Sequence, residues 1–206
     1  MCIRDSLTPV ASYRGKPGGA AKGGMEIDEY RRRQEQFRMA EIHALLDTEY
    51  FIDRAQRLYG YDNFICDTGG SICEWVDADD PKDPVLSELS KQALMVWIKG
   101  DEAHTEELVR RFDRAPKPMS YQPEFLTHVW TEYLSENNLS EAEVDPDTFI
   151  RWTYAQALAH RQPRYAAMAK NWGVTVTADQ VAAATDQDRF TDLIAGAIDA
   201  ALETRS

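Results

Sequence analysis

The stretch Ala93-Leu-Met-Val-Trp-Ile98 decides the fold, because every residue in it is apolar. A strand places successive side chains on opposite faces, so both faces of this one would be apolar, as in a central strand of a parallel sheet. Two further short stretches, Phe64-Ile-Cys-Asp67 and Val174-Thr-Val176, are also predicted to be strands. A charged segment from about Glu102 to Phe112 follows the first stretch and is predicted to be a helix. Strands separated by helices predict an α/β fold, with a parallel sheet flanked by helices.

Periodic apolar residues and capping signals predict the remaining helices. They cover approximately residues 27–47, 50–59, 124–137, 148–160, 164–171 and 188–203. Gly60 is expected to end the second of them as a C-cap. Three prolines between Arg114 and Pro123 exclude a continuous helix there. A helix break is predicted at His160-Arg-Gln-Pro-Arg-Tyr165. A purely helical fold would not account for the apolar stretches Phe64–Asp67 and Ala93–Ile98.

The first part of the chain differs in character from the rest. Met1 to Ser6 resembles translated cloning sequence, the alternative being a short disordered native tail. Leu7 to Tyr13 is interpreted as a strand remnant. The glycine-rich stretch from Gly15 to Gly24 lacks the G-x-x-x-x-G-K-[ST] pattern and is expected to be a flexible connection. We therefore divide the chain into a segment 1–25 and one domain, 26–206.

Composition excludes several classes of protein. The net charge of −12 disfavours nucleic-acid binding, since a surface that tracks phosphates needs an excess of Lys and Arg. The longest apolar run, Ala93 to Ile98, is far too short to span a membrane. The three cysteines form no C-x-x-C pair, which argues against a disulfide framework and against a zinc site. A cytoplasmic location is expected, and no metal-ligating residues are predicted.

Asp67 and the Thr68-Gly-Gly-Ser71 turn form the first candidate site. They follow a predicted strand, and ligands of open α/β sheets bind beyond the carboxyl ends of the strands. Glycines allow a ligand to approach the backbone, and an acid there could orient a Mg²⁺-bound water or accept the proton of a substrate hydroxyl. The alternative is a tight turn in which Asp67 is a local cap.

Three further groups of basic residues are candidates. Arg38 and Glu41 share a helical face and could pair, which would present the guanidinium to a carboxylate or phosphate. Arg110, Arg111 and Arg114 precede the proline-rich stretch and could neutralise a transferring phosphoryl group. The alternatives are a solvated ion pair for the first group and simple complementation of the helix dipole for the second. Arg161 lies in the predicted helix break.

The order of these groups resembles shikimate kinase and related small-molecule kinases. F-R-x-x-E on a helix is followed by T-G-G after a strand, then by a helix with arginines, and then by R-x-P-x-Y before a short strand and a final helix. The matching positions are Phe37, Arg38, Glu41, Thr68, Gly69, Gly70, Arg110, Arg111, Arg114, Arg161, Pro163 and Tyr165. Parts of the chain are also similar to a bacterial family of P-loop proteins described simply as ATPases.

The resemblance implies a fold and a set of roles. It implies a P-loop NTPase fold whose first strand–P-loop–helix unit is missing, and ATP and Mg²⁺ as ligands of the complete protein. The residues expected to face the acceptor or substrate are Arg38, Glu41, Gly69, Gly70, Ser71 and Arg161. The residues expected to act in catalysis are Asp67 and the lid arginines Arg110, Arg111 and Arg114. Ser71 replaces the third glycine of the family pattern, so an acceptor other than shikimate is expected.

The expected function is therefore that of a P-loop ATPase or small-molecule phosphotransferase in its complete form. Its partners would be a nucleotide and an unidentified small acceptor or water. This chain, lacking the P-loop, is expected to be an inactive fragment. The alternative is a non-enzymatic acidic α/β module that binds a protein or a small anion.

Overall fold

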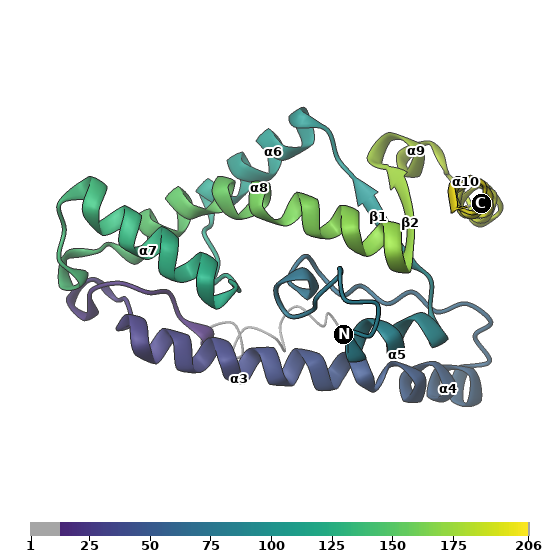
Figure 1. The fold of residues 1–206 in the computed structure, drawn as a ribbon, viewed down its shortest axis with the longest axis horizontal. Coiled ribbons are helices and arrows are strands. Elements are labelled where there is room, and N and C mark those ends of the chain that lie inside the picture. Colours follow the sequence, from purple (N-terminus) through teal and green to yellow (C-terminus); the bar gives the residue numbers. More distant parts are fainter. Residues whose placement is uncertain (1–12, 206) are drawn as a thin grey trace. The chain divides into compact units, whose positions relative to one another are not determined.

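The computed structural model describes residues 13–205, and it is a mixed α/β structure made mostly of helices (Figure 1). Met1 to Ser6 and most of the expected strand remnant, residues 7–12, lie outside the described part. The elements follow in the order η1 (Ala20–Lys22), α3 (Ile27–Leu46), α4 (Thr48–Tyr59), η2 (Ile72–Glu74), α5 (Pro84–Gln92), β1 (Met95–Lys99), α6 (Glu102–Arg114), α7 (Pro123–Asn137), η3 (Glu141–Glu143), α8 (Pro146–Trp172), β2 (Gly173–Thr177), α9 (Ala178–Ala183) and α10 (Gln187–Arg205). Within residues 13–205, no helix has both the length and the apolar composition needed to cross a membrane.

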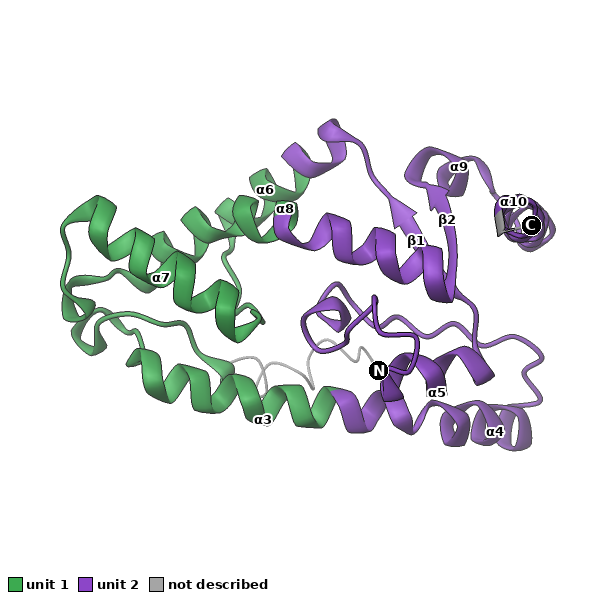
Figure 2. Ribbon diagram, in the orientation of Figure 1, with its two compact units in different colours: residues 1–41, 107–159 green, residues 42–106, 160–206 purple. Residues whose placement is uncertain are grey.

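The chain divides into two compact units (Figure 2). Among the described residues, unit 1 comprises 13–41 and 107–159, and unit 2 comprises 42–106 and 160–205. The boundaries between them fall inside α3, α6 and α8, so each of these helices contributes to both units. Each unit has its own hydrophobic core.

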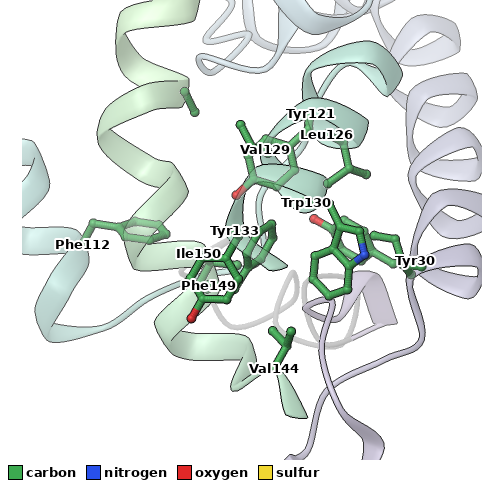
Figure 3. Packing of buried hydrophobic residues seen from close by; sticks show 12 residues of the cluster. Tyr30, Phe112, Tyr121, Leu126, Val129, Trp130, Tyr133, Val144, Phe149 and Ile150 are labelled. Carbon is green, nitrogen blue, oxygen red and sulfur yellow. The ribbon is translucent and has the colours of Figure 1, made fainter. Parts of the chain in front are cut away.

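Unit 1 is built around aromatic side chains (Figure 3). Phe149 on α8 meets Trp130 and Tyr133 on α7 edge to face, with ring centroids 4.9 and 5.2 Å apart. This is the preferred geometry for aromatic pairs, and such contacts add to the free energy gained from burial. The buried Tyr121 hydroxyl lies 2.9 Å from the Thr153 hydroxyl, which satisfies both polar groups.

The glycine-rich stretch, which was expected to be a flexible connection, makes backbone hydrogen bonds within unit 1. Its ends are joined by hydrogen bonds from Gly18 N to Met25 O and from Met25 N to Lys16 O, both 2.9 Å long. Gly19 donates to Val144 O, and a Cβ atom on Gly19 would lie only 2.0 Å from Ala142 O. The glycines therefore allow backbones to pack closely.

Unit 2 contains the parallel sheet, which is confirmed but is small. β1 and β2 lie side by side in Figure 1, with Met95 opposite Gly173 and Lys99 opposite Thr177. A Cβ atom on Gly173 would lie 2.1 Å from Met95 O, so this first pair requires glycine. The strand predicted at residues 93–98 is confirmed two residues later than expected at its start.

β1 is not buried on both faces as its composition predicts. Among the described residues it has β2 as its single neighbour, and Ile98 is 51% exposed. The strand predicted at Phe64–Asp67 is wrong, because no strand is assigned there and Ile65 is 86% exposed. Its apolar composition is that of a strand, but residues 13–205 provide no neighbouring strand to form a ladder with it.

Most predicted helices are confirmed, including α4 with its left-handed C-cap at Gly60. The break predicted near Pro163 is wrong, since α8 continues through this proline to Trp172. Proline in a helix interior removes one hydrogen bond. The flanking residues Arg161, Arg164 and Tyr165 bond to Glu74, Cys73 and Gly70 of the same unit. Two helices, α5 and α9, were not predicted from the sequence, although both start with capping side chains.

Candidate functional site

The second half of α8 holds the turn after Asp67 in place. Arg161 and Tyr165 are four residues apart, so they share a face of the helix. The Tyr165 hydroxyl donates to Gly70 O at 2.7 Å, and Arg161 Nε donates to Glu74 Oε1 at 2.5 Å. The T-G-G turn and the R-x-P-x-Y segment, which the sequence analysis treated as separate motifs, are therefore in direct contact.

The ion pair of Arg161 with Glu74 is buried. The Glu74 side chain is 0% exposed and that of Arg161 is 7% exposed. Burial opposes the charge of Arg161, but the combined interactions with Glu74, Tyr165 and Cys73 outweigh burial and raise the pKa of the guanidinium. Arg161 is thus held by a carboxylate inside unit 2, and its charge is compensated within the protein.

Backbone carbonyls in the same loop accept further hydrogen bonds from α8. Arg164 Nη1 donates to Cys73 O at 3.2 Å, and Asn171 Nδ2 donates to Ala78 O at 2.8 Å. Glu74, Arg164 and Asn171 were missed as site residues. The spacing of Arg161, Arg164 and Tyr165 by three and four residues was the available signal, because it places all three on neighbouring turns of one helix.

The polar groups beneath the turn are held in their neutral forms. Burial, followed by the nearby charge of Glu74, raises the pKa of the Cys73 thiol to about 11. Burial, followed by the Cys73 sulfur, also raises the pKa of Tyr165. Desolvation, followed by the charge of Arg164, lowers the pKa of His160, which favours the neutral imidazole.

The turn itself has an exposed carboxylate at its start. Asp67 Oδ1 accepts from Gly69 N at 2.9 Å, and Gly69 has a φ of 63°, which suits glycine. This geometry is that of the local cap considered above as the alternative to a catalytic role. Gly70 lies against the Tyr165 ring, since a Cβ atom on it would lie 2.8 Å from the hydroxyl oxygen. Ser71 is half-buried and precedes η2.

Arg38 and Glu41 lie in unit 1, and the predicted pairing between them is wrong. Arg38 Nε and Nη2 donate to the two carboxylate oxygens of Glu35, at 2.7 and 2.6 Å. This bidentate contact lowers the pKa of Glu35 and raises that of Arg38. Glu41 instead accepts from Arg14 at 3.0 Å. Glu35 and Glu41 are each three residues from Arg38 and so are equally close to it on the helix, and Arg38 binds the one on its N-terminal side.

The three lid arginines also lie in unit 1, at the C-terminal end of α6. Arg110 binds Glu107, and Arg111 lies 3.5 Å from the same carboxylate. The hydrogen bond from Arg110 lowers the pKa of Glu107. Arg114 is exposed. Arg151 of α8 donates to Asp113 O at 3.0 Å, which adds a cation that the sequence analysis did not identify.

The structure therefore gathers part of the predicted site. Asp67, Gly69, Gly70, Ser71 and Arg161 belong to one assembly in unit 2, in which Arg161 is bonded to Glu74. The other predicted residues, Arg38, Glu41, Arg110, Arg111 and Arg114, belong to unit 1, and each is described within that unit.

The acidic side chains and the glycine-rich loop are the described features that bear on binding of a metal ion or a phosphate. No group of three or more His, Cys, Asp or Glu side chains within residues 13–205 could hold a metal ion. The amides of Gly18 and Gly19, in the glycine-rich loop, donate to Met25 O and Val144 O, so this loop does not present them to a phosphate.

Comparisons with models of protein families, with curated proteins and with solved structures found no match.

Proposed function

We propose that this chain is the acceptor and lid part of a cytoplasmic P-loop kinase-like ATPase or small-molecule phosphotransferase. The observation that carries the proposal is the contact of the T-G-G turn with the R-x-P-x-Y segment through Tyr165 and Gly70. Two motifs that are 95 residues apart at this contact, and whose order suggested the resemblance, form one assembly.

The incomplete sheet supports the same proposal. A strand as apolar as β1 is typical of a sheet interior, yet β1 has one neighbour among the described residues. Phe64 and Ile65, in the stretch that was expected to be a strand, are 41% and 86% exposed. A further strand leading into a phosphate-binding loop would cover this apolar surface. In the complete protein that loop would hold the phosphates of ATP with Mg²⁺.

The residues of this chain would then have separate roles. Asp67, whose carboxylate is exposed, would accept the proton of an acceptor hydroxyl or orient a water. Gly69 and Gly70 would let the acceptor approach the backbone. Arg161 would position the turn through Glu74 and would not bind the substrate itself. Arg110, Arg111 and Arg114 would neutralise charge on the transferring group, exchanging exposed ion pairs that are individually weak.

The test begins with the coding sequence upstream of Leu7 in the parent gene. We expect a G-x-x-x-x-G-K-[ST] motif after an apolar stretch, and ADP release from the protein that includes it, measured against pooled metabolites and water. Replacing the motif lysine by alanine should abolish turnover. Asp67→Asn should lower kcat by about 100-fold or more, as for loss of a general base. Absence of the motif would overturn the proposal.

A second candidate function is supported by the exposed aromatic residues of α4. Tyr50, Phe51, Tyr59 and Leu58 are each about half exposed or more, and exposed apolar patches of this kind mark protein interfaces. This observation favours a non-enzymatic binding module with a protein partner. A protein that has no phosphate-binding motif but retains a partner through this helix would support the module over the enzyme.

A further inference from the structure

Unit 2 contains a pocket that none of the motifs above explains. Its volume is about 300 Å³. One wall is the loop from Cys73 to Asp79, and the other is the part of α8 from His160 to Met168. Both walls belong to unit 2, so the pocket is complete within one compact body.

The two walls are held together by side-chain bonds, which makes the pocket preformed. Arg164 donates to Cys73 O and Asn171 donates to Ala78 O, joining helix to loop at both ends. Asp83 also holds the loop in place. Its side chain is 7% exposed, and its Oδ2 accepts a hydrogen bond from Asp77 N at 2.9 Å. Binding to a preformed site avoids much of the entropy cost of ordering it.

Charges of opposite sign line opposite walls. The loop contributes the acidic residues Asp77 and Asp79, whereas the helix contributes the basic residue Arg164 and His160, whose neutral imidazole can donate a hydrogen bond but carries no charge. The rest of the lining is apolar or weakly polar and consists of Cys73, Val76, Ala78, Pro163, Ala167 and Met168. A ligand that matches this lining carries a cation at one end, an anion at the other and a small apolar group.

We propose that this pocket binds a small zwitterion of the free α-amino acid class, with an apolar side chain. Its ammonium group would face Asp77 and Asp79, its carboxylate would face Arg164 and His160, and its side chain would contact Val76 and Ala167. The volume lies at the lower end of the range of about 300–1,000 Å³ for ligand sites, which suits an amino acid better than a nucleotide. The inference does not depend on the proposed phosphoryl transfer.

The test uses L-leucine as the probe and amide chemical shifts of the ¹⁵N-labelled chain as the readout. We expect saturable shifts at Val76, Ala78 and Ala167 with a Kd of roughly millimolar order, as for a ligand of so few atoms. Isocaproate lacks the ammonium group and isoamylamine lacks the carboxylate, so each should bind about tenfold more weakly. Equal binding of all three would overturn the proposal, as would the absence of saturable shifts with L-leucine.

Variants separate recognition from folding. Asp77→Asn combined with Asp79→Asn should weaken L-leucine binding about tenfold while leaving isocaproate binding unchanged or stronger. Ala167→Phe should fill the pocket and abolish binding with every charge still present. Asp53→Asn, on the exposed surface of α4, is the matched control and should bind as the parent chain does. Unchanged L-leucine binding by a folded Ala167→Phe variant would place the ligand elsewhere and overturn the proposal.

Discussion

At the scale of single residues, the buried pair of Glu74 and Arg161 has the largest energetic consequence. Both side chains are withdrawn from water, so each charge depends on the other for compensation. The same chain has exposed pairs, such as Arg57 with Asp53, which water and salt screen. The two kinds of pair should respond very differently to the loss of one partner.

Glu74→Gln should lower the free energy of unfolding by about 3–5 kcal/mol, because it leaves a buried guanidinium without a counter-charge. Asp53→Asn should change it by less than about 1 kcal/mol. Urea unfolding followed by circular dichroism measures both. Equal losses in the two variants would mean that Arg161 reaches solvent in solution.

The Cys73 thiol should make stability depend on alkaline pH. Its pKa is raised by burial from 9.0 to about 11, so the folded state keeps its proton where the unfolded state has released it. Stability contributed by this group is therefore complete below pH 9 and falls as the pH rises toward 11, by up to about 2 kcal/mol. Unfolding midpoints measured between about pH 8 and 10 should fall in the parent chain and fall less in Cys73→Ala. Parallel curves would contradict the burial of this thiol.

At the scale of elements, the helices and strands predicted correctly are those whose own residues carry a local pattern, such as apolar spacing or a capping glycine. The helices at residues 27–46 and 48–59 follow from apolar spacing and a terminal glycine, and β1 follows from an uninterrupted apolar run. Phe64 to Asp67 has a strand's composition, but a strand also needs a neighbour, which a local pattern does not report. Pro163 indicates a break locally, whereas α8 continues through it in the structure.

The candidate site divides along the same line. The T-G-G turn was recognised from its local sequence. Its contacts could not be, because Tyr165 and Arg161, which bond to Gly70 and Glu74, lie about 90 residues further along the chain. Glu74 was missed because one glutamate in an acidic chain carries no local signal. The choice of Arg38 between Glu35 and Glu41 is likewise decided by side-chain geometry.

Hydrogen exchange should distinguish β1 from the stretch at Phe64–Asp67. Amides of β1 and β2 that bond across the ladder should be protected, whereas those of residues 63–67 should exchange at rates close to those of an unfolded chain. Mass spectrometry of peptides from each stretch measures this. Equal protection of the two would indicate that residues 63–67 are paired in solution.

The α5 helix offers a second test at this scale. Asp83 caps it, with Oδ1 accepting from Val85 N and Leu86 N, and the other oxygen accepting from Asp77 N. Asp83→Ala should lower the free energy of unfolding by about 1–3 kcal/mol, because buried donors lose their acceptor. Asp62→Ala, at an exposed position outside the helices, should cost less than about 0.5 kcal/mol. Similar losses in the two variants would contradict the cap.

At the scale of the whole molecule, net charge and exposed apolar surface act against each other. The net charge of −12 makes the molecules repel one another and so opposes association. The large apolar side chains exposed on α4 and the following residues favour association. Leu58, Tyr59, Tyr61 and Ile65 are each more than half exposed. Salt should therefore shift the balance toward association by screening the charge.

Sedimentation velocity should show self-association that increases with protein concentration and with salt. Leu58→Glu combined with Ile65→Lys should reduce it, since both substitutions place charges in the apolar surface without changing the net charge. Leu108→Glu, at an exposed leucine of unit 1, is the control and should leave association unchanged. If the protein stayed monomeric at every concentration and salt level, this apolar surface would not mediate self-association, and the prediction would be wrong.

The close approach of Gly173 to Met95 has a consequence for tracing the ancestry of the chain. With 2.1 Å between a would-be Cβ atom and Met95 O, no other amino acid can occupy the position while the two strands stay in register. Surface positions, by contrast, drift freely over generations. We therefore expect homologous proteins to keep a glycine between a long helix and a short strand of β-branched residues, even where the rest of their sequence is no longer similar.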